Sequence, residues 1–218
     1  MNGFGAFWDQ GDAVTRAVAL LLLAMSVSAW VVILWKGWIL AAARRSLTRA
    51  VPAFWAAMNL EAGREALRNF DKEDIVLPLL EAATAPTQPQ TLDATGRTES
   101  RLTRRLRDAL HAVLHRLQFG QVLLASVGAT APFVGLFGTV WGIYHALASM
   151  AAGGNVTIEK IAGPVGEALI MTAAGLAVAI PAVLAYNIYG KQVGACEAEL
   201  EGFAHDLREM LDEQPVNE

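Results

Sequence analysis

The sequence predicts an all-α membrane protein with three transmembrane helices, the second and third of which extend into a cytoplasmic helical bundle. Three uncharged runs carry this prediction, because residues 17–35, 117–158 and 168–190 contain no Asp, Glu, Lys or Arg. A hydrocarbon core about 30 Å thick needs roughly 20 apolar residues of helix, so each run is long enough to cross a bilayer. A helix also satisfies its own backbone hydrogen bonds, which lipid cannot do.

The uneven distribution of Lys and Arg predicts how the three helices are oriented. Residues 36–116 hold 13 of these basic residues and residues 191–218 hold two, whereas residues 1–16 and the turn between the second and third helices hold one each. Basic residues stay on the cytoplasmic side of a membrane. The N terminus is therefore expected outside the cytoplasm and the C terminus inside.

The first transmembrane helix is expected over residues 17–36, after a periplasmic N-terminal segment over residues 1–16. Asp9 and Asp12 stand where a cleavable signal peptide would carry basic residues. The apolar run is also longer than the roughly 7–15 residues that are typical of such a signal. This helix is therefore predicted to remain as a membrane anchor.

A cytoplasmic helical loop is expected over residues 37–116. It begins with an Ala-rich, basic stretch that is interrupted at Pro52, and short helices follow over residues 61–70 and 73–83. The second of these is expected to break at Pro78, because proline disrupts the interior of a helix.

From Thr98 the loop is predicted to form an amphipathic helix. Apolar side chains recur there at spacings of three and four, opposite a face of arginines. This helix is expected to run without a break into the second transmembrane helix. Its apolar face consists of Leu102, Leu106, Leu110, Val113 and Leu117.

Residues 117–190 are expected to hold the second and third transmembrane helices, joined by a short periplasmic turn at about 151–160. Residues 191–218 are expected to form an acidic cytoplasmic helix with a net charge of −6, against +4 for residues 36–116. The two segments either pack together or form separately solvated faces. Cys196, the only cysteine, lies in this tail and is expected to react there with thiol reagents.

A continuous seam of small residues follows one face of the second transmembrane helix, and the third helix repeats it. Small faces let membrane helices approach closely, so helix packing is the simplest role. Packing explains less well why a hydroxyl, Thr139 or Thr172, lies near mid-depth in each seam. The small residues expected to pack are Gly128, Pro132, Gly135 and Gly142 in the second helix, and Ala168 and Gly175 in the third.

Glu167 is the only carboxylate within the predicted transmembrane helices. A charge at the centre of a helix in lipid costs on the order of 2.5–3.5 kcal/mol, and such residues usually mark ion pathways or polar pairs. Glu167 lies near the outer interface, so a structural role there stays open. It is about 140° around the helix from Thr172, so the two side chains need not share a face.

The remaining polar residues predict no catalytic or metal site. His145 is expected to make buried hydrogen bonds rather than to act in catalysis, and His111 and His115 lack a third ligand. The chain contains no phosphate-binding glycine loop, zinc-binding helix motif or serine nucleophile elbow. It is therefore predicted not to be an enzyme, to bind no cofactor, and to have the lipid bilayer rather than nucleic acid as its surroundings.

Two segments resemble a known family. Residues 127–147 contain the run Thr-Ala-Pro-Phe-Val-Gly-Leu-Phe-Gly-Thr-Val-Trp-Gly, and residues 162–187 run from Ala-Gly-Pro-Val-Gly-Glu to Ala-Tyr-Asn. Both resemble the second and third transmembrane helices of the ExbB/TolQ/MotA proton-channel family. Within that family the first segment looks most like the ExbB branch, with the TolQ branch next.

The resemblance implies a subunit of a motor in the bacterial inner membrane. Five copies would surround the transmembrane helices of an ExbD-like partner that carries a transmembrane aspartate. Proton flow would then energise a TonB-like protein for outer-membrane transport, such as uptake of iron–siderophores. By the same resemblance, Thr139 and Thr172 correspond to pore-facing threonines and Glu167 to the glutamate of the third helix, and these three residues form the expected proton pathway.

The residues themselves agree with a shared pathway, because threonine cannot carry a proton at physiological pH and no carboxylate lies at mid-depth. A titratable group must then come from another chain. Three alternatives remain open: a TolQ-type subunit of the Tol–Pal envelope system, a membrane scaffold that conducts no protons, and an unrecognised membrane enzyme.

Overall fold

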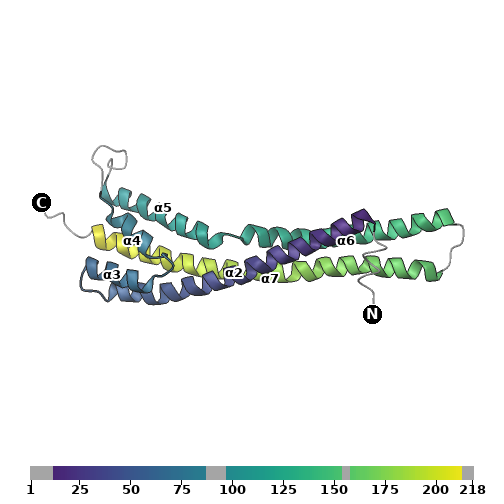
Figure 1. Ribbon diagram of the computed structural model, residues 1–218. Helices are drawn as coiled ribbons and strands as arrows, with labels where there is room; N and C mark the ends of the chain where they lie inside the picture. The colour runs from purple at the N-terminus through teal and green to yellow at the C-terminus, as the bar shows by residue number, and fades with distance from the viewer. Residues whose placement is uncertain (1–11, 87–96, 154–157, 213–218) are drawn as a thin grey trace. The chain divides into compact units, whose positions relative to one another are not determined.

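The structure is a computed structural model that describes residues 12–86, 97–153 and 158–212, and every element in it is an α-helix (Figure 1). Three helical stretches, Ala13–Trp55, Thr98–Ser149 and Ala162–Asp212, are long and apolar enough to cross a membrane. The predicted all-α membrane fold with three transmembrane helices is thereby confirmed, while its orientation stays a prediction. The helices are α2 (Ala13–Trp55), α3 (Leu60–Phe70), α4 (Leu77–Thr84), α5 (Thr98–Gln118), α6 (Gln121–Gly153) and α7 (Ile158–Asp212).

The chain divides into two compact units. The spanning unit comprises residues 1–35 and 120–188, and the bundle unit comprises residues 36–119 and 189–218. Because α2 and α7 each continue from one unit into the other, neither helix ends where its apolar run ends. An apolar run marks where a helix meets lipid, whereas a helix in water ends only where its backbone hydrogen bonding stops.

Three of the expected helix limits differ from the structure. The first of these, α2, continues beyond residue 36 and through Pro52, and it ends only at Trp55. Pro78 occupies the first turn of α4, where a proline costs nothing, so it begins that helix instead of breaking it. Of the turn expected at about 151–160, residues 151–153 belong to α6 and residues 158–160 to α7, and residues 154–157 lie outside the described part of the chain.

Local hydrogen bonds explain where α3 and α4 begin. The side chain of Asn59 accepts a hydrogen bond from the Ala62 amide at 2.8 Å and caps the start of α3. Oδ2 of the buried Asp71 accepts three backbone amides, from Ile75, Val76 and Leu77, at 2.7–2.8 Å. One carboxylate therefore satisfies most of the amides that the start of α4 leaves without a helical partner.

A break at Phe119 and Gly120 separates α5 from α6, so the single long helix expected from Thr98 is wrong. Gly120 has a φ of 81°, a conformation that favours glycine. The ammonium of Lys36, which is 1% exposed, donates to the carbonyls of Leu117 and Phe119 at the end of α5. A cation at this position satisfies carbonyls that the broken helix leaves unpaired.

The bundle unit has one apolar core, built from the second half of α2, from α3 to α5, and from the end of α7. The five apolar residues predicted on one face of α5 are all buried in it, as the amphipathic pattern indicated. Phe203 of α7 meets Phe54 of α2 with ring centroids 5.2 Å apart. The acidic tail and the basic loop therefore pack together, and the contact between them is apolar.

Cys196 lies inside this core at 2% exposure, so the expected reactivity of its thiol is wrong. Burial raises the pKa of the thiol, and Glu199 raises it further while Arg44 opposes that effect. Since the thiolate is the reactive form, both access and ionisation are reduced. A thiol reagent is expected to label native Cys196 slowly even in lysed cells, and fully after denaturation.

An exposed cysteine gives a sharper test of orientation. A Cβ atom on Gly194 would have no heavy atom within 4 Å, so Gly194→Cys in a Cys196→Ala background should fold normally and expose its thiol. We expect a membrane-impermeant maleimide to label this variant in lysed spheroplasts and not in intact ones. Equal labelling in both preparations would contradict the predicted cytoplasmic C terminus.

Candidate functional site

The small-residue seams of α6 and α7 face each other within one chain. A Cβ atom on Gly135 would lie 2.6 Å from the Met171 carbonyl oxygen and 3.1 Å from the Gly175 Cα. A Cβ atom on Gly175 would lie 2.6 Å from the carbonyl oxygen of Ala131. The two backbones are therefore in direct contact here, and any side chain at either position would push the helices apart.

The other predicted packing residues lie along the same contact. A Cβ atom on Gly128 would meet Val183 at 2.5 Å, and one on Gly142 would meet the Cβ of Ala168 at 2.9 Å. Ala168 is buried and Pro132 is half-buried. The sequence prediction missed Gly138, where a Cβ atom would lie 3.0 Å from Val18 of α2. That glycine lets α2 approach α6 closely.

Thr139 and Thr172 meet at the centre of this contact. Thr139 is only 7% exposed, and its hydroxyl forms a hydrogen bond with the hydroxyl of Thr172. The Thr139 oxygen also lies 3.2 Å from the Gly135 carbonyl oxygen and 3.1 Å from that of Ala168. A hydroxyl has one proton to donate and can accept from two directions. The pair can therefore exchange donor and acceptor roles without moving either helix.

Glu167 lies apart from the threonine pair, on the wall of a cavity of about 290 Å³ in the spanning unit. Its neighbour Ala168 lines the same cavity, and the Ala168 carbonyl oxygen is one of the two that Thr139 approaches. One residue of the cavity wall therefore contacts Thr139, although neither threonine lines the cavity. It is lined by Asp12, Thr15, Gly138, Gly142, His145, Ala146, Ser149, Pro164, Glu167, Ala168 and Met171.

Asp12 is a residue of this site that the sequence reasoning missed. Its Oδ1 accepts the Thr15 amide at 2.8 Å and so caps α2, and its Oδ2 accepts the indole N–H of Trp141 at 2.6 Å. Burial raises the pKa of Asp12, but the hydrogen bonds from Thr15 and Trp141, together with the nearby His145, outweigh it and hold the pKa below its ordinary value. An aspartate just before an apolar helix is a cap signal, but nothing in the sequence pairs it with Trp141.

His145 lies next to Asp12, with its Nδ1 3.9 Å from Asp12 Oδ2. Its side chain is 59% exposed, so the expected buried hydrogen bonding is wrong. Three titratable side chains from three different helices, Asp12, His145 and Glu167, thus line one cavity. Among the described residues, no group of three His, Cys, Asp or Glu is placed to hold a metal ion.

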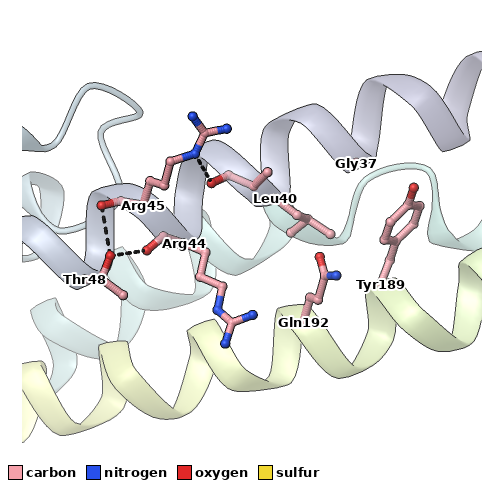
Figure 2. A pocket seen from close by; sticks show the side chains of 8 residues that line it. Gly37, Leu40, Arg44, Arg45, Thr48, Tyr189 and Gln192 are labelled. Carbon is pink, nitrogen blue, oxygen red and sulfur yellow. Dashed lines mark hydrogen bonds between the residues drawn. The ribbon is translucent and has the colours of Figure 1, made fainter.

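A second cavity, of about 430 Å³, lies in the bundle unit between α2 and α7 and contains none of the predicted site residues. Figure 2 shows the side chain of Arg44 reaching from α2 toward Gln192 of α7, with Gly37 and Tyr189 at the other end. The Arg45 guanidinium extends away from α7, and its Nε donates to the Ala41 carbonyl at 3.1 Å. This cavity is basic, whereas the one beside the threonines carries two carboxylates.

Comparison with known proteins identifies a matching family and close relatives. The MotA/TolQ/ExbB proton channel family matches residues 73–202. The biopolymer transport protein ExbB of Xanthomonas campestris pv. campestris (strain B100) is 41% identical over 92% of this chain and 83% of its own length. ExbB of Neisseria meningitidis serogroup A is 36% identical over 94% of both chains. The Tol-Pal system protein TolQ of Pseudomonas aeruginosa is 33% identical over 93% of this chain and 90% of its own.

Proposed function

Because the chain belongs to the MotA/TolQ/ExbB proton channel family, we propose that it is the proton-conducting subunit that energises a TonB-like protein for outer-membrane transport. It is a multi-pass membrane protein and an ExbB/TolQ-type motor subunit. Five copies would surround an ExbD-like partner in the bacterial inner membrane, with the N terminus periplasmic and the C terminus cytoplasmic. Uptake of iron–siderophores is one transport process that such a complex would drive.

The observation that carries this proposal is the threonine pair at the closest contact of α6 and α7. The pair is polar, with Thr139 buried and Thr172 half-buried, and each hydroxyl can donate or accept a hydrogen bond. Neither hydroxyl gains or loses a proton at physiological pH. Glu167 lies apart, on the cavity wall. A continuous path therefore needs a titratable group from a second chain opposite Thr139 and Thr172, and a transmembrane aspartate of an ExbD-like partner would supply it.

The domain arrangement follows from this orientation. Residues 1–16 would face the periplasm, residues 37–116 would form a cytoplasmic helical loop, and residues 191–218 would complete the bundle on the same side. Arg44 and Arg45 support a cytoplasmic location for the bundle unit, because basic side chains next to a membrane span stay on the cytoplasmic side. Each proton that crosses about 100 mV releases about 2.3 kcal/mol, so the work on a TonB-like protein would take several protons.

The proposal is tested by proton flux in proteoliposomes. We expect acidification of vesicles under a potassium diffusion potential only when this chain is co-reconstituted with its aspartate-bearing partner, and no flux when that aspartate is replaced by asparagine. Flux from this chain alone would contradict the need for a second chain. No flux in any combination would favour a non-conducting scaffold.

A second candidate, a TolQ-type subunit of a Tol–Pal system, is supported by the relative from Pseudomonas aeruginosa. The ExbB relatives from Xanthomonas campestris and Neisseria meningitidis are more similar, at 36–41% identity against 33%, which favours the ExbB-type assignment. Complementation separates the two assignments. We expect this chain, expressed with its partner, to restore siderophore uptake in a strain without its ExbB-type subunit and to leave the envelope defect of a strain without TolQ uncorrected.

A further inference from the structure

Asp12 and His145 line the same cavity as Glu167, whereas neither threonine of the pair lines it. Asp12 directly precedes α2 and caps it, and His145 lies on α6 one helical turn beyond Trp141. In the single chain the Asp12 side chain is 23% exposed and that of His145 is 59% exposed. Thr139, in contrast, is almost fully buried. The cavity that this acid–base pair lines reaches Ala168, whose carbonyl oxygen lies 3.1 Å from the Thr139 hydroxyl.

Helix capping alone does not explain the geometry of Asp12. The cap uses only Oδ1, while Oδ2 accepts the Trp141 indole N–H and faces the imidazole. An indole N–H can only donate, so it favours the ionised carboxylate. The distance of 3.9 Å between Oδ2 and Nδ1 is too long for a direct hydrogen bond. It suits an ion pair, or one proton shared through a water molecule.

Two other charged side chains lie next to this pair in the chain or in the cavity. Arg16 lies one turn after Asp12 on α2, and Glu167 of α7 lines the same cavity. Imidazole is the side chain whose charge changes most readily near neutral pH. The Asp12 carboxylate lies beside this imidazole. Its negative charge raises the local concentration of protons, just as a charged cleft raises the local concentration of its counter-ions.

We propose that Asp12 and His145 together form the first proton-accepting site of the pathway, and that Trp141 acts as a positioning residue for Asp12. This inference rests on the proposed proton conduction and deepens it. A hydronium ion from the outer solution transfers its proton to the imidazole and leaves water. The imidazolium, paired with the Asp12 carboxylate, then passes that proton to the Glu167 carboxylate across the cavity. The imidazole returns to its neutral form, so the protons balance.

The test measures proton flux through the complete reconstituted complex as a function of the outer pH. We expect Asp12→Asn and His145→Gln each to lower the flux about tenfold at about pH 7.5, where protons are scarce and focusing matters most. At about pH 5.5 the loss should shrink to about twofold or less, because the higher proton concentration replaces the missing site. The double variant should be no slower than the slower single variant, since both residues serve one step.

A merely structural role for Asp12 predicts a different pattern. Asparagine is also a good helix cap, so Asp12→Asn keeps the start of α2. Trp141→Phe removes the indole donor and leaves the acid–base pair in place, so it should lower the flux less than either pair variant. Glu61→Gln, which removes an 81%-exposed carboxylate in the bundle unit, serves as the control and should leave the flux unchanged. Equal losses at all pH values for Asp12→Asn would overturn the proposal.

Titration of Asp12 supplies a readout that does not depend on flux. His145 and Trp141 both lower the pKa of Asp12, so His145→Gln and Trp141→Phe should each raise it, as followed by isotope-edited infrared spectroscopy. An unchanged Asp12 titration in His145→Gln would show that the two groups are not coupled and would overturn the inference. A wild-type complex without proton flux would instead overturn the proposed function, and the proton-accepting role with it.

Discussion

We expect Thr139→Val combined with Thr172→Val to abolish energised uptake while leaving the oligomer and partner binding intact. Valine nearly keeps the shape of threonine, so the contact between α6 and α7 should survive. The two carbonyls near the Thr139 hydroxyl belong to helices and keep their backbone hydrogen bonds. The double variant loses both hydroxyls. A hydroxyl can donate a hydrogen bond to a partner's ionised carboxylate and accept one from its protonated form, which valine cannot do.

The single serine variants are the matched controls for this experiment. Thr139→Ser and Thr172→Ser keep the hydroxyl and lose one methyl group, which costs on the order of 1 kcal/mol in a packed interior. Most of the uptake should therefore remain. The measurement is siderophore uptake, recorded beside a pull-down of the partner. Full uptake by the double valine variant would contradict a pore-facing role and leave packing as the account of both residues.

Gly135→Leu should have the largest effect on stability. The Cβ atom alone would lie 2.6 Å from the Met171 carbonyl oxygen, so the clash is with backbone that cannot rotate away. Overpacking costs typically about 1–3 kcal/mol even where side chains can adjust, and here the two helices must separate. We expect Gly135→Leu to unfold the spanning unit within each chain, so that loss of the oligomer follows from loss of the fold.

Alanine variants make this comparison sharper. Gly135→Ala should lower the melting temperature in detergent by several degrees, since a loss of about 1 kcal/mol typically shifts it by about 2–4 °C in a chain of this size. Gly166→Ala is the matched control, because a Cβ atom there meets nothing within 4 Å. Native mass spectrometry of both variants reports the oligomer. Equal melting temperatures for the two alanine variants would contradict the backbone contact at Gly135.

Residue patterns predicted the features that depend on one segment at a time. The apolar face of α5 is buried as its spacing indicated, because each of those side chains needs only to leave water. The limits of α2 and the start of α4 were predicted less well. Hydropathy does not mark where a helix ends in water, and the role of Pro78 depends on whether it lies in the first turn or in the interior of a helix.

The candidate site was predicted only in part, for a similar reason. Thr139 and Thr172 were each recognisable as hydroxyls in a small-residue seam, but they are 33 residues apart and nothing local pairs them. Asp12 and Trp141 are 129 residues apart, and their hydrogen bond exists only because α2 packs against α6. Gly138, which permits that packing, lies outside the seam that the spacing revealed.

The sequence by itself determined that three uncharged runs cross the bilayer and that small residues let two of these helices touch. Both follow from properties of single segments, namely the cost of placing charge in lipid and the size of side chains on one face. Only the tertiary structure decided which seam meets which, that the two threonines share a hydrogen bond, and that Asp12, His145 and Glu167 line one cavity. Those contacts depend on how separate helices pack, and the pattern within one helix does not specify the rotation of its neighbour.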